Sequence, residues 1–438
     1  MSIYKLILYP MKKIFDKNFL SFCINQFALL FLILVTFSYF YINLQDNVSS
    51  LYAYKELFIN YQSGLIRRGL LGEIFWFFNK HFSIDPVIFF ANLFLFLHLI
   101  QIYLFYKIFK KFSQSYFIYI LVFLSPSLIL FYFYDVNLYF LKDTFVTLTI
   151  LFHALILINF FNKKENKESY LKILKYFILP ILILTILIHE YQVLFLGVHF
   201  LFSLSVAKDK KAIIRILKIY SILLIPIFFV LIFIGNQAQF ENLNLILNNK
   251  FGLTVHQQLG GGFYKAIGGF IVWHFYYFTY NDFINLFLCS ILSIGTFFLL
   301  FHYFKIKKII TFHSYYQKKY FIFFLPTLAV FVLATDHGRN ISLITFHLIA
   351  FYAMLNFDLK KFKTFENNKS FFVNLFLILF LFFYIFLWKM DQGAGFWLKG
   401  EPNSIFQNSL FSEIIKIFKI IYNYIDLNII KLPRVIVG

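Results

Sequence analysis

Hydrophobic residues fill most of this chain in long stretches that short polar segments interrupt. Many of the stretches approach twenty residues, the length that an α-helix needs to cross the hydrocarbon core of a bilayer. We therefore expect an all-α, polytopic integral membrane protein with about eleven spans. The predicted spans lie near residues 23–44, 84–106, 116–134, 138–161, 175–188, 191–206, 219–235, 282–304, 320–335, 341–357 and 370–390.

Composition supports a membrane protein. Hydrophobic residues make up 61% of the 438 residues and charged residues only 14%, with a mean hydropathy of +0.76. A soluble domain is typically about 45–50% apolar and about 25% charged. These values exclude a water-soluble globule, a disordered chain and a disulfide scaffold. We expect one membrane domain over residues 1–400 and an amphipathic tail over 401–438 on the outer membrane surface.

Basic residues indicate which side of each span faces the cytoplasm. The six polar segments that contain the Lys and Arg clusters hold 26 basic and 6 acidic residues, and the rest of the chain holds 14 of each. Short basic loops stay cytoplasmic, so we place all six inside, with the N-terminus inside and the C-terminus outside. Anionic headgroups of an inner membrane explain the net charge of +20 without a nucleic-acid partner.

Three pairs of spans reverse direction at charged turns on the predicted outer side. The turns lie at residues 135–143, 189–190 and 336–340. Two full spans with a turn need about 40 residues, and the second pair has fewer. Its turn should therefore stop short of the outer surface, within a protein-lined, water-filled cavity where irregular backbone is tolerated.

Two adjacent arginines in the first outer segment are the strongest candidates for ligand binding. Arg67 and Arg68 stand between Gly64 and Gly69, and the chain has only five Arg against 35 Lys. Guanidinium groups bind phosphate through paired hydrogen bonds, and glycine lets backbone approach closely. The alternative is an interfacial helix whose arginines contact lipid headgroups without specificity.

The other outer turns add ionisable residues, which are functional candidates when they lie at membrane depth. Their alternative roles are helix starts and helix caps. The candidates for substrate or phosphate binding are Arg67, Arg68, Lys142, Asp143, His189, Asp336, His337 and Arg339. The candidate catalytic carboxylates are Asp46, Glu56 and Glu190.

Other sequence features give weaker signals. The glycine-rich segment 259–269 lacks the GK[ST] sequence of a phosphate-binding Walker loop. The single histidines inside spans (His98, His153, His199, His302 and His347) are expected to form packing hydrogen bonds. No Cys/His cluster predicts a metal site, so we expect no cofactor and leave a divalent metal ion open.

This layout resembles the C-type membrane glycosyltransferases, which use polyprenyl-phosphate sugars as donors. The resemblance rests on the number of spans, the charged first outer loop and the short hairpins, over roughly residues 20–395. It implies sugar transfer to an envelope glycan or lipid acceptor on the extracytoplasmic face. In that family a carboxylate of the first outer loop is the base, which corresponds to Asp46, or second to Glu56. The chain departs from the family by lacking an adjacent acidic pair there and a soluble C-terminal domain.

Physical requirements lead to the same activity. A departing lipid phosphate needs cations, which Arg67, Arg68 and Arg339 could supply, and the acceptor proton needs a carboxylate such as Asp46 or Glu190. The outer arginines also resemble those of O-antigen and exopolysaccharide polymerases, the first alternative. A transporter or lipid flippase is the second alternative, and would place charges near mid-membrane. A structural subunit of an envelope complex is the third.

The topology can be tested with a cysteine in place of Ser50. Residues 45–82 are predicted to lie outside, so a membrane-impermeant maleimide should label this cysteine from the extracytoplasmic side of intact cells or spheroplasts. Labelling from the cytoplasmic side alone would contradict the predicted orientation.

Overall fold

The structure is a computed structural model in which the chain is helical. It describes residues 17–45, 51–110, 116–133, 136–163, 167–207, 209–233, 235–255, 286–297, 325–328, 337–354, 379–381 and 384. These residues contain helices and turns and no strand, which confirms the all-α prediction for this part of the chain. The predicted tail, 401–438, and the glycine-rich segment, 259–269, lie outside the described residues.

Five helical segments are long and apolar enough to cross a membrane, among the residues that the structure describes. They indicate a membrane protein, and the predicted number of eleven spans stays a prediction. The segments are the apolar part of α2 (Lys17–Gln45), α5 (Pro86–Phe109), α8 (Asp143–Lys163), the helix from α9 through α10 (Lys167–Ile188), and α12 with α13 (Lys210–Ile232).

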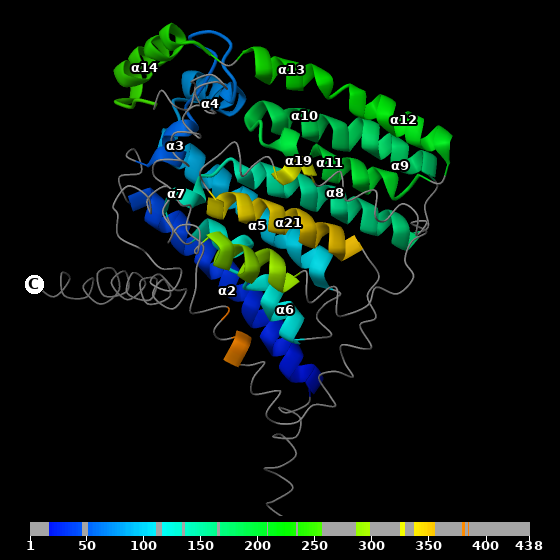
Figure 1. Cartoon of the computed structure of the whole chain (residues 1–438). Helices are drawn as coiled ribbons and strands as arrows, with labels where there is room; N and C mark the ends of the chain where they lie inside the picture. Colours follow the sequence, from blue (N-terminus) through cyan, green and yellow to red (C-terminus); the bar gives the residue numbers. More distant parts are fainter. Residues whose placement is uncertain are drawn as a thin grey trace, which may run out of the picture.

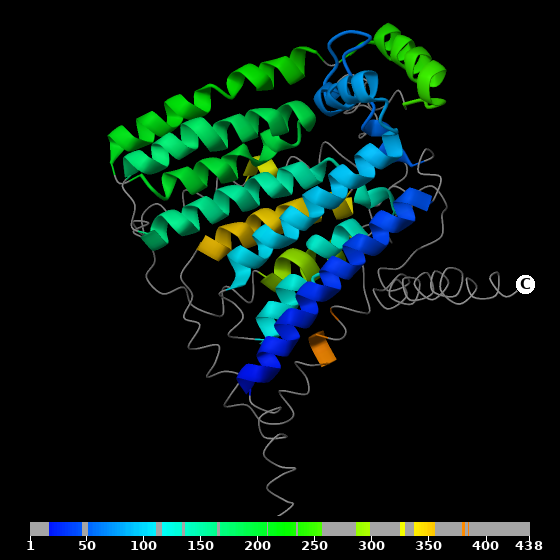
Figure 2. The same cartoon turned by 180° about the vertical axis from the view of Figure 1, so that it is seen from behind.

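Helix α8 is at the centre of the bundle. It packs between α5 and α21 (His337–Met354), and α2 packs on the far side of α5 (Figures 1 and 2). On the opposite side, α10 and α11 (Gln192–Leu204) contact α8, and α13 lies against α10. Large apolar side chains on α13 face outward, with Ile225 73% and Ile232 68% exposed, as is typical of a surface in contact with lipid.

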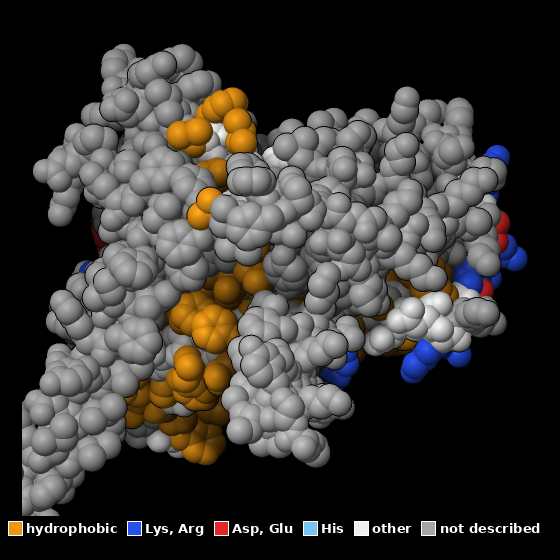
Figure 3. Space-filling model, turned by 90° about the horizontal axis from the view of Figure 1, so that it is seen from below, with side chains coloured by type: hydrophobic (Ala, Val, Ile, Leu, Met, Phe, Trp, Pro, Cys, Tyr) orange, Lys and Arg blue, Asp and Glu red, His pale blue; other side chains and the backbone are white. Residues whose placement is uncertain are grey.

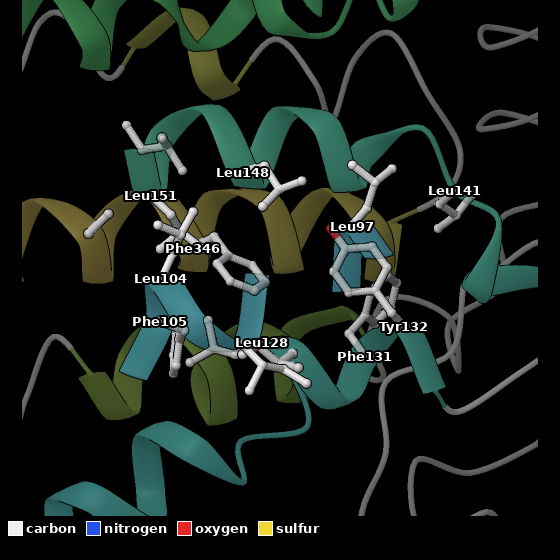
Figure 4. Packing of buried hydrophobic residues seen from close by; sticks show 14 of the residues in the cluster. Leu97, Leu104, Phe105, Leu128, Phe131, Tyr132, Leu141, Leu148, Leu151 and Phe346 are labelled. Atoms are coloured by element: carbon white, nitrogen blue, oxygen red, sulfur yellow. The ribbon is translucent and has the colours of Figure 1, made fainter. Parts of the chain in front are cut away.

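The core between α5, α8 and α21 consists of interlocking aliphatic and aromatic side chains. Figure 4 shows Leu104 and Phe105 of α5 facing Leu148 and Leu151 of α8, with Phe346 of α21 between them. Of these side chains Leu148 is the most exposed, at 6%. This core fixes the relative positions of the helix starts that carry the polar residues described below.

The predicted span 116–134 is wrong as a continuous helix. The chain forms α6 (Tyr116–Phe123), a turn, a 3-10 helix (Ile129–Phe133) and the short α7 (Val136–Tyr139). The break falls at Pro126, since proline removes a backbone donor and disfavours helix at the preceding residue. The Ser125 hydroxyl there contacts Tyr384 Oη at 3.0 Å, so the broken segment is held by side-chain hydrogen bonds.

Two helices begin earlier than their apolar stretches predict. The span predicted at 175–188 is the end of a helix that begins with α9 (Lys167–Ile173) and continues through a π-helical turn, Leu174–Ile178, into α10 (Leu179–Ile188). The span predicted at 219–235 begins with α12 (Lys210–Ser221), where the Asp209 carboxylate accepts from Ala212 N at 2.7 Å. Of the two helices in the predicted tight hairpin, only α11 is as short as the sequence predicted.

The two ends of the bundle differ in charge. At one end, α5 and α8 finish and α9 and α12 begin, and ion pairs join Lys167 to Asp209 and Arg215 to Glu168. Lys and Arg side chains gather at this basic end in Figure 3. At the other end, α8, α11 and α21 begin. This separation matches the predicted grouping of basic segments, and the assignment of the basic end to the cytoplasm stays a prediction.

One short helix and two longer helices cover the end opposite the basic end. They are α3 (Tyr52–Glu56), α4 (Gly69–Phe82) and α14 (Gln237–Phe251) (Figure 1). Helix α4 is close to the preceding loop because Gly72 has no side chain. A Cβ there would lie 2.1 Å from the Ile59 carbonyl oxygen. The remaining described elements are a π-helical turn, Ile291–Gly295, and α19 (Leu325–Leu328).

We predict that Gly72→Ala destabilises the fold. The new methyl group would collide with backbone, and overpacking of this kind typically costs about 1–3 kcal/mol. The melting temperature of the purified protein in detergent should fall. Gly295→Ala is the matched control, since a Cβ there meets its nearest neighbour at an ordinary 3.7 Å. Equal melting temperatures for Gly72→Ala and the wild type would contradict the close approach.

Candidate functional site

Eight of the predicted site residues come together in one group, which we call the charge cluster. They come from α3, the loop before α4, the start of α8, the turn between α10 and α11, and the first turn of α21. Each member contacts at least one other through a hydrogen bond or ion pair. The members are Glu56, Arg67, Arg68, Lys142, Asp143, His189, Glu190 and Arg339.

The loop before α4 positions two of these residues through its backbone. Arg68 adopts a left-handed conformation with φ of 64°, which is unusual for a residue with a side chain. Its neighbour Gly69 packs so closely on Tyr61 that a Cβ would lie 2.3 Å from the ring. The backbone N–H of Arg67 donates to the Phe233 carbonyl at 2.7 Å, which ties the loop to the end of α13. Strained backbone held this firmly is common at functional sites.

Arg68 bridges two carboxylates. Its Nη1 donates to Glu56 Oε1 at 2.6 Å, and its Nε lies 2.8 and 2.7 Å from the two oxygens of Glu190. Its Nη2 donates to Glu190 as well. The Arg68 guanidinium therefore has little remaining capacity to bind a ligand without displacing a carboxylate. Glu56 is buried, whereas 17% of the Glu190 side chain is exposed.

Arg67 is less fully paired than Arg68. Its Nη1 lies 3.6 Å from Glu190 Oε1, which is an ion pair without a short hydrogen bond. Its Nε has no hydrogen-bond partner among the residues that the structure describes. Burial lowers the pKa of Arg67, and Glu190 only partly offsets this effect. An incoming anion could pair with this guanidinium at small cost.

Asp143, His189 and Arg339 form the deepest part of the charge cluster. The Asp143 carboxylate accepts from Arg339 Nε and, at 3.0 Å, from Arg339 Nη2. His189 Nε2 lies 2.7 Å from Asp143 Oδ1 and 2.6 Å from Arg339 Nη2. The rings of His189 and Tyr191 stack with centroids 4.7 Å apart, and Arg339 lies 4.9 Å from the Tyr191 centroid. This group fixes the starts of α8, α11 and α21 against one another.

Lys142 stabilises backbone within the charge cluster. Its buried ammonium donates to the carbonyl oxygens of Glu56 and Arg68, at 3.0 and 3.2 Å. Both carbonyls belong to residues of the Arg68 ion pairs, so Lys142 joins the end of α3 to the start of α4. The geometry therefore favours a positioning role for Lys142 over direct contact with a substrate.

Neighbouring cations keep Glu56 and Glu190 ionised. Burial alone would raise the pKa of Glu56, but Arg68 and Lys142 outweigh it, and the pKa lies below its ordinary value. Burial acts in the same direction on Glu190, and Arg68 and Arg67 hold its pKa well below the ordinary value. In turn, the two carboxylates outweigh burial and hold the pKa of Arg68 well above its usual range.

The charge cluster has an excess of positive charge. Among these eight residues, three arginines and Lys142 face three carboxylates, so one positive charge stays uncompensated before His189 is counted. The starts of α4, α8, α11 and α21 also lie here, and each helix start carries about half a positive charge. The arrangement can therefore bind an anion next to a carboxylate.

Three predicted site residues are not among the members of the charge cluster. Asp46 and Asp336 lie outside the described residues. His337 is the first residue of α21, and its side chain is not described. The glycines flanking the arginines were expected to let backbone approach a ligand. In the structure Gly69 packs against Tyr61 and Gly64 approaches Gln239, so the close contacts are made within the chain itself.

Sequence reasoning missed two residues next to the charge cluster. Tyr191 lies against both His189 and Arg339. The fully buried Gln192 amide has no hydrogen-bond partner within the described part of the chain. Tyr191 and Gln192 are the two residues after Glu190, and this position beside a predicted site residue is the sequence signal that could have identified them. The described residues contain no group of three His, Cys, Asp or Glu side chains arranged to hold a metal ion.

Comparisons with known proteins identify no relative. The chain matches no protein-family model, no curated protein and no solved structure.

We predict that Glu56→Gln destabilises the protein at neutral pH, because it leaves Arg68 buried with one carboxylate fewer. Breaking a buried ion pair typically costs about 3–5 kcal/mol. The lowered pKa means that the ionised Glu56 contributes its full stability above about pH 4.3, the ordinary value for glutamate. That contribution is lost as the pH falls through the lower pKa of the folded protein.

Melting temperatures at neutral and acidic pH test this expectation. The wild type should lose more stability on acidification than Glu56→Gln, which has no carboxylate to protonate. Glu241→Gln on the exposed face of α14 is the matched control and should melt like the wild type at both pH values. A Glu56→Gln variant as stable as the wild type at neutral pH would contradict the proposed pairing energy.

Proposed function

We propose that this protein is a membrane-embedded glycosyltransferase. It moves a sugar from a polyprenyl-phosphate donor to an envelope glycan or lipid acceptor on the extracytoplasmic face of the inner membrane. The observation that carries the proposal is the incompletely paired Arg67 beside Glu190, within a charge cluster that has excess positive charge. A cation with spare donors next to a partly exposed carboxylate meets both needs of transfer from a lipid phosphate.

The donor phosphate binds at Arg67 and shares the charge of Arg68. A phosphate has the oxygens that a guanidinium fork can engage in pairs. Its arrival weakens the hold of both arginines on Glu190, the outer carboxylate that they share. The pKa of Glu190 then rises toward its ordinary value, and the carboxylate becomes a better base for a neighbouring hydroxyl group.

The reaction follows from these roles. The acceptor hydroxyl attacks the anomeric carbon of the sugar, and the bond from that carbon to the phosphate oxygen breaks. The hydroxyl proton passes to Glu190, and the negative charge of the departing phosphate is stabilised by Arg67. Glu56, which is buried and paired with Arg68, positions that arginine and does not meet the acceptor. Asp46 keeps its proposed role as an alternative base.

A glycan polymerase of the O-antigen type is the second candidate. It uses the same chemistry on lipid-linked glycans whose leaving group is a diphosphate. The net single positive charge of the eight residues favours the monophosphate donor, because a diphosphate brings more negative charge to be balanced. The two donors can be compared directly in the assay below.

The test of this function is donor-dependent transfer by the purified protein in nanodiscs. Release of polyprenyl phosphate is measured from a panel of polyprenyl-phosphate monosaccharides in the presence of membrane extract as acceptor. Arg67→Lys keeps the charge but loses the paired donors, and loss of one such donor typically lowers the rate by about 10²–10³. We expect Arg67→Lys and Arg67→Ala to be impaired alike.

Arg215→Lys is the matched control, because Arg215 pairs with Glu168 at the basic end of the bundle. It should keep full activity. Polyprenyl phosphate should also raise the melting temperature of the wild type more than the uncharged polyprenol does. Full activity of Arg67→Lys, or equal stabilisation by the two lipids, would refute the phosphate site.

A further inference from the structure

A second polar feature crosses the interior of the bundle away from the charge cluster. Five side chains form a continuous hydrogen-bonded chain. Tyr220 Oη lies 3.0 Å from Ser203 Oγ, which lies 2.9 Å from Tyr170 Oη. Tyr170 Oη lies 2.8 Å from His153 Nε2, and His153 Nδ1 lies 3.0 Å from His199 Nδ1. We call these five residues the polar chain.

The polar chain extends from the basic half of the bundle to its middle. Tyr170 lies in the first turns of α9, Ser203 lies in the last turn of α11, and the partly exposed Tyr220 lies on α12. His153 is at the midpoint of α8, roughly 15 Å along the helix axis from Asp143. Ionisable groups at this depth in a membrane are costly and commonly mark a proton or ion pathway.

A third histidine adjoins the inner end of the polar chain. The rings of His199 and His347 lie with centroids 6.2 Å apart. His347 Nδ1 donates to the Leu343 carbonyl at 2.7 Å, which leaves its Nε2 as an acceptor. The Nε2 atoms of both histidines are buried and have no hydrogen-bond partner within the described ranges. Packing hydrogen bonds, the role expected from the sequence, do not account for two unpaired imidazole nitrogens.

One apolar layer separates these histidines from the charge cluster. It consists of Val146 of α8, Phe195 of α11, and Leu343 and Ile344 of α21. Phe195 lies about one turn from Gln192 on one side and one turn from His199 on the other, so Gln192 and His199 are about 10 Å apart along the helix axis. The Phe195 ring stacks on His347 with centroids 4.0 Å apart. Rotation of this one side chain would remove the apolar contact over the imidazole.

Every member of the polar chain can both donate and accept a hydrogen bond. A proton that arrives at His199 Nε2 allows the Nδ1 proton of that ring to pass to His153 Nδ1. His153 Nε2 then gives its proton to Tyr170, Tyr170 to Ser203, and Ser203 to Tyr220, which releases one proton. At each member one N–H or O–H bond forms and one breaks, and no charge stays behind. The reverse sequence carries a proton inward.

We propose that the polar chain is a proton pathway between the basic end of the bundle and the charge cluster, and that Phe195 is its gate. The pathway is independent of the proposed glycosyl transfer, since it shares no residue with the charge cluster. Its ligand is the proton alone.

Proton flux into proteoliposomes tests the pathway. Vesicles containing the full chain and the trapped pH dye pyranine are given a potassium diffusion potential with valinomycin. Phe195→Ala should open the gate and raise the flux above that of the wild type. Tyr170→Phe removes one hydroxyl group from the chain, and combined with Phe195→Ala it should return the flux to the level of protein-free vesicles. Phe195→Leu replaces Phe195→Ala if the larger cavity prevents folding.

Two controls separate a proton pathway from a leaking bundle. Phe94→Ala makes a comparable cavity at a fully buried Phe of α5 and should not raise the flux. Tyr139→Phe, combined with Phe195→Ala, removes a buried hydroxyl that donates to the Ala91 carbonyl outside the polar chain, and should leave the flux high. Equal flux in Phe195→Ala with and without Tyr170→Phe would overturn the proposal. No rise in flux for either Phe195 variant would overturn it as well.

Discussion

The Arg68 ion pairs determine how this end of the bundle is built. A guanidinium buried among apolar helices is tolerated only when carboxylates satisfy it, and Arg68 has one from α3 and one from the turn between α10 and α11. Glu56 and Glu190 lie far apart in sequence, so their shared partner joins α3 to the turn between α10 and α11. The left-handed backbone at Arg68 and the Lys142 contacts to the loop carbonyls are consequences of bringing this side chain to that position.

Depth divides the charge cluster into residues that hold the fold and residues that can meet a ligand. Asp143, His189 and Arg339 are buried and pair with one another, which secures the helix starts. Arg67 and Glu190 retain some exposure and are joined only at 3.6 Å. Such a site can exchange an internal ion pair for a pair with a substrate while the deeper layer stays intact. This is why we assign chemistry to the outer layer alone.

The sequence predicted the membrane-protein class, the helical fold and the set of polar turns that converge. Scarcity of arginine and the placement of charges at span ends were sufficient for this, because an apolar environment leaves few other places for charge. The sequence could not distinguish Arg67 from Arg68, since both have the same neighbours in sequence and differ only in the carboxylates that reach them. It also missed the break at Pro126 and the early starts of α9 and α12. Hydropathy records where a chain can enter lipid, whereas helix ends follow from caps and packing.

The contacts between histidines far apart in the chain could not be predicted from the sequence either. His153, His199 and His347 each look like an isolated polar residue within an apolar stretch, and only the packing of three helices brings them together. The assignment of each to packing was reasonable for one residue at a time. It did not anticipate that two of their ring nitrogens would have no hydrogen-bond partner among the residues that the structure describes.

The convergence of four helix starts at the charge cluster has an evolutionary consequence. Part of the positive potential there comes from aligned backbone amides, which every sequence that keeps this topology must retain. A substitution that removes one arginine would therefore weaken the attraction for anions without abolishing it. The side chains at this end can be substituted during evolution, and a charge lost at one position can be regained at another, as long as the helices still begin at the same place. Among distant descendants of such a chain, the positions of helix starts would be a more durable mark of common ancestry than any arginine motif.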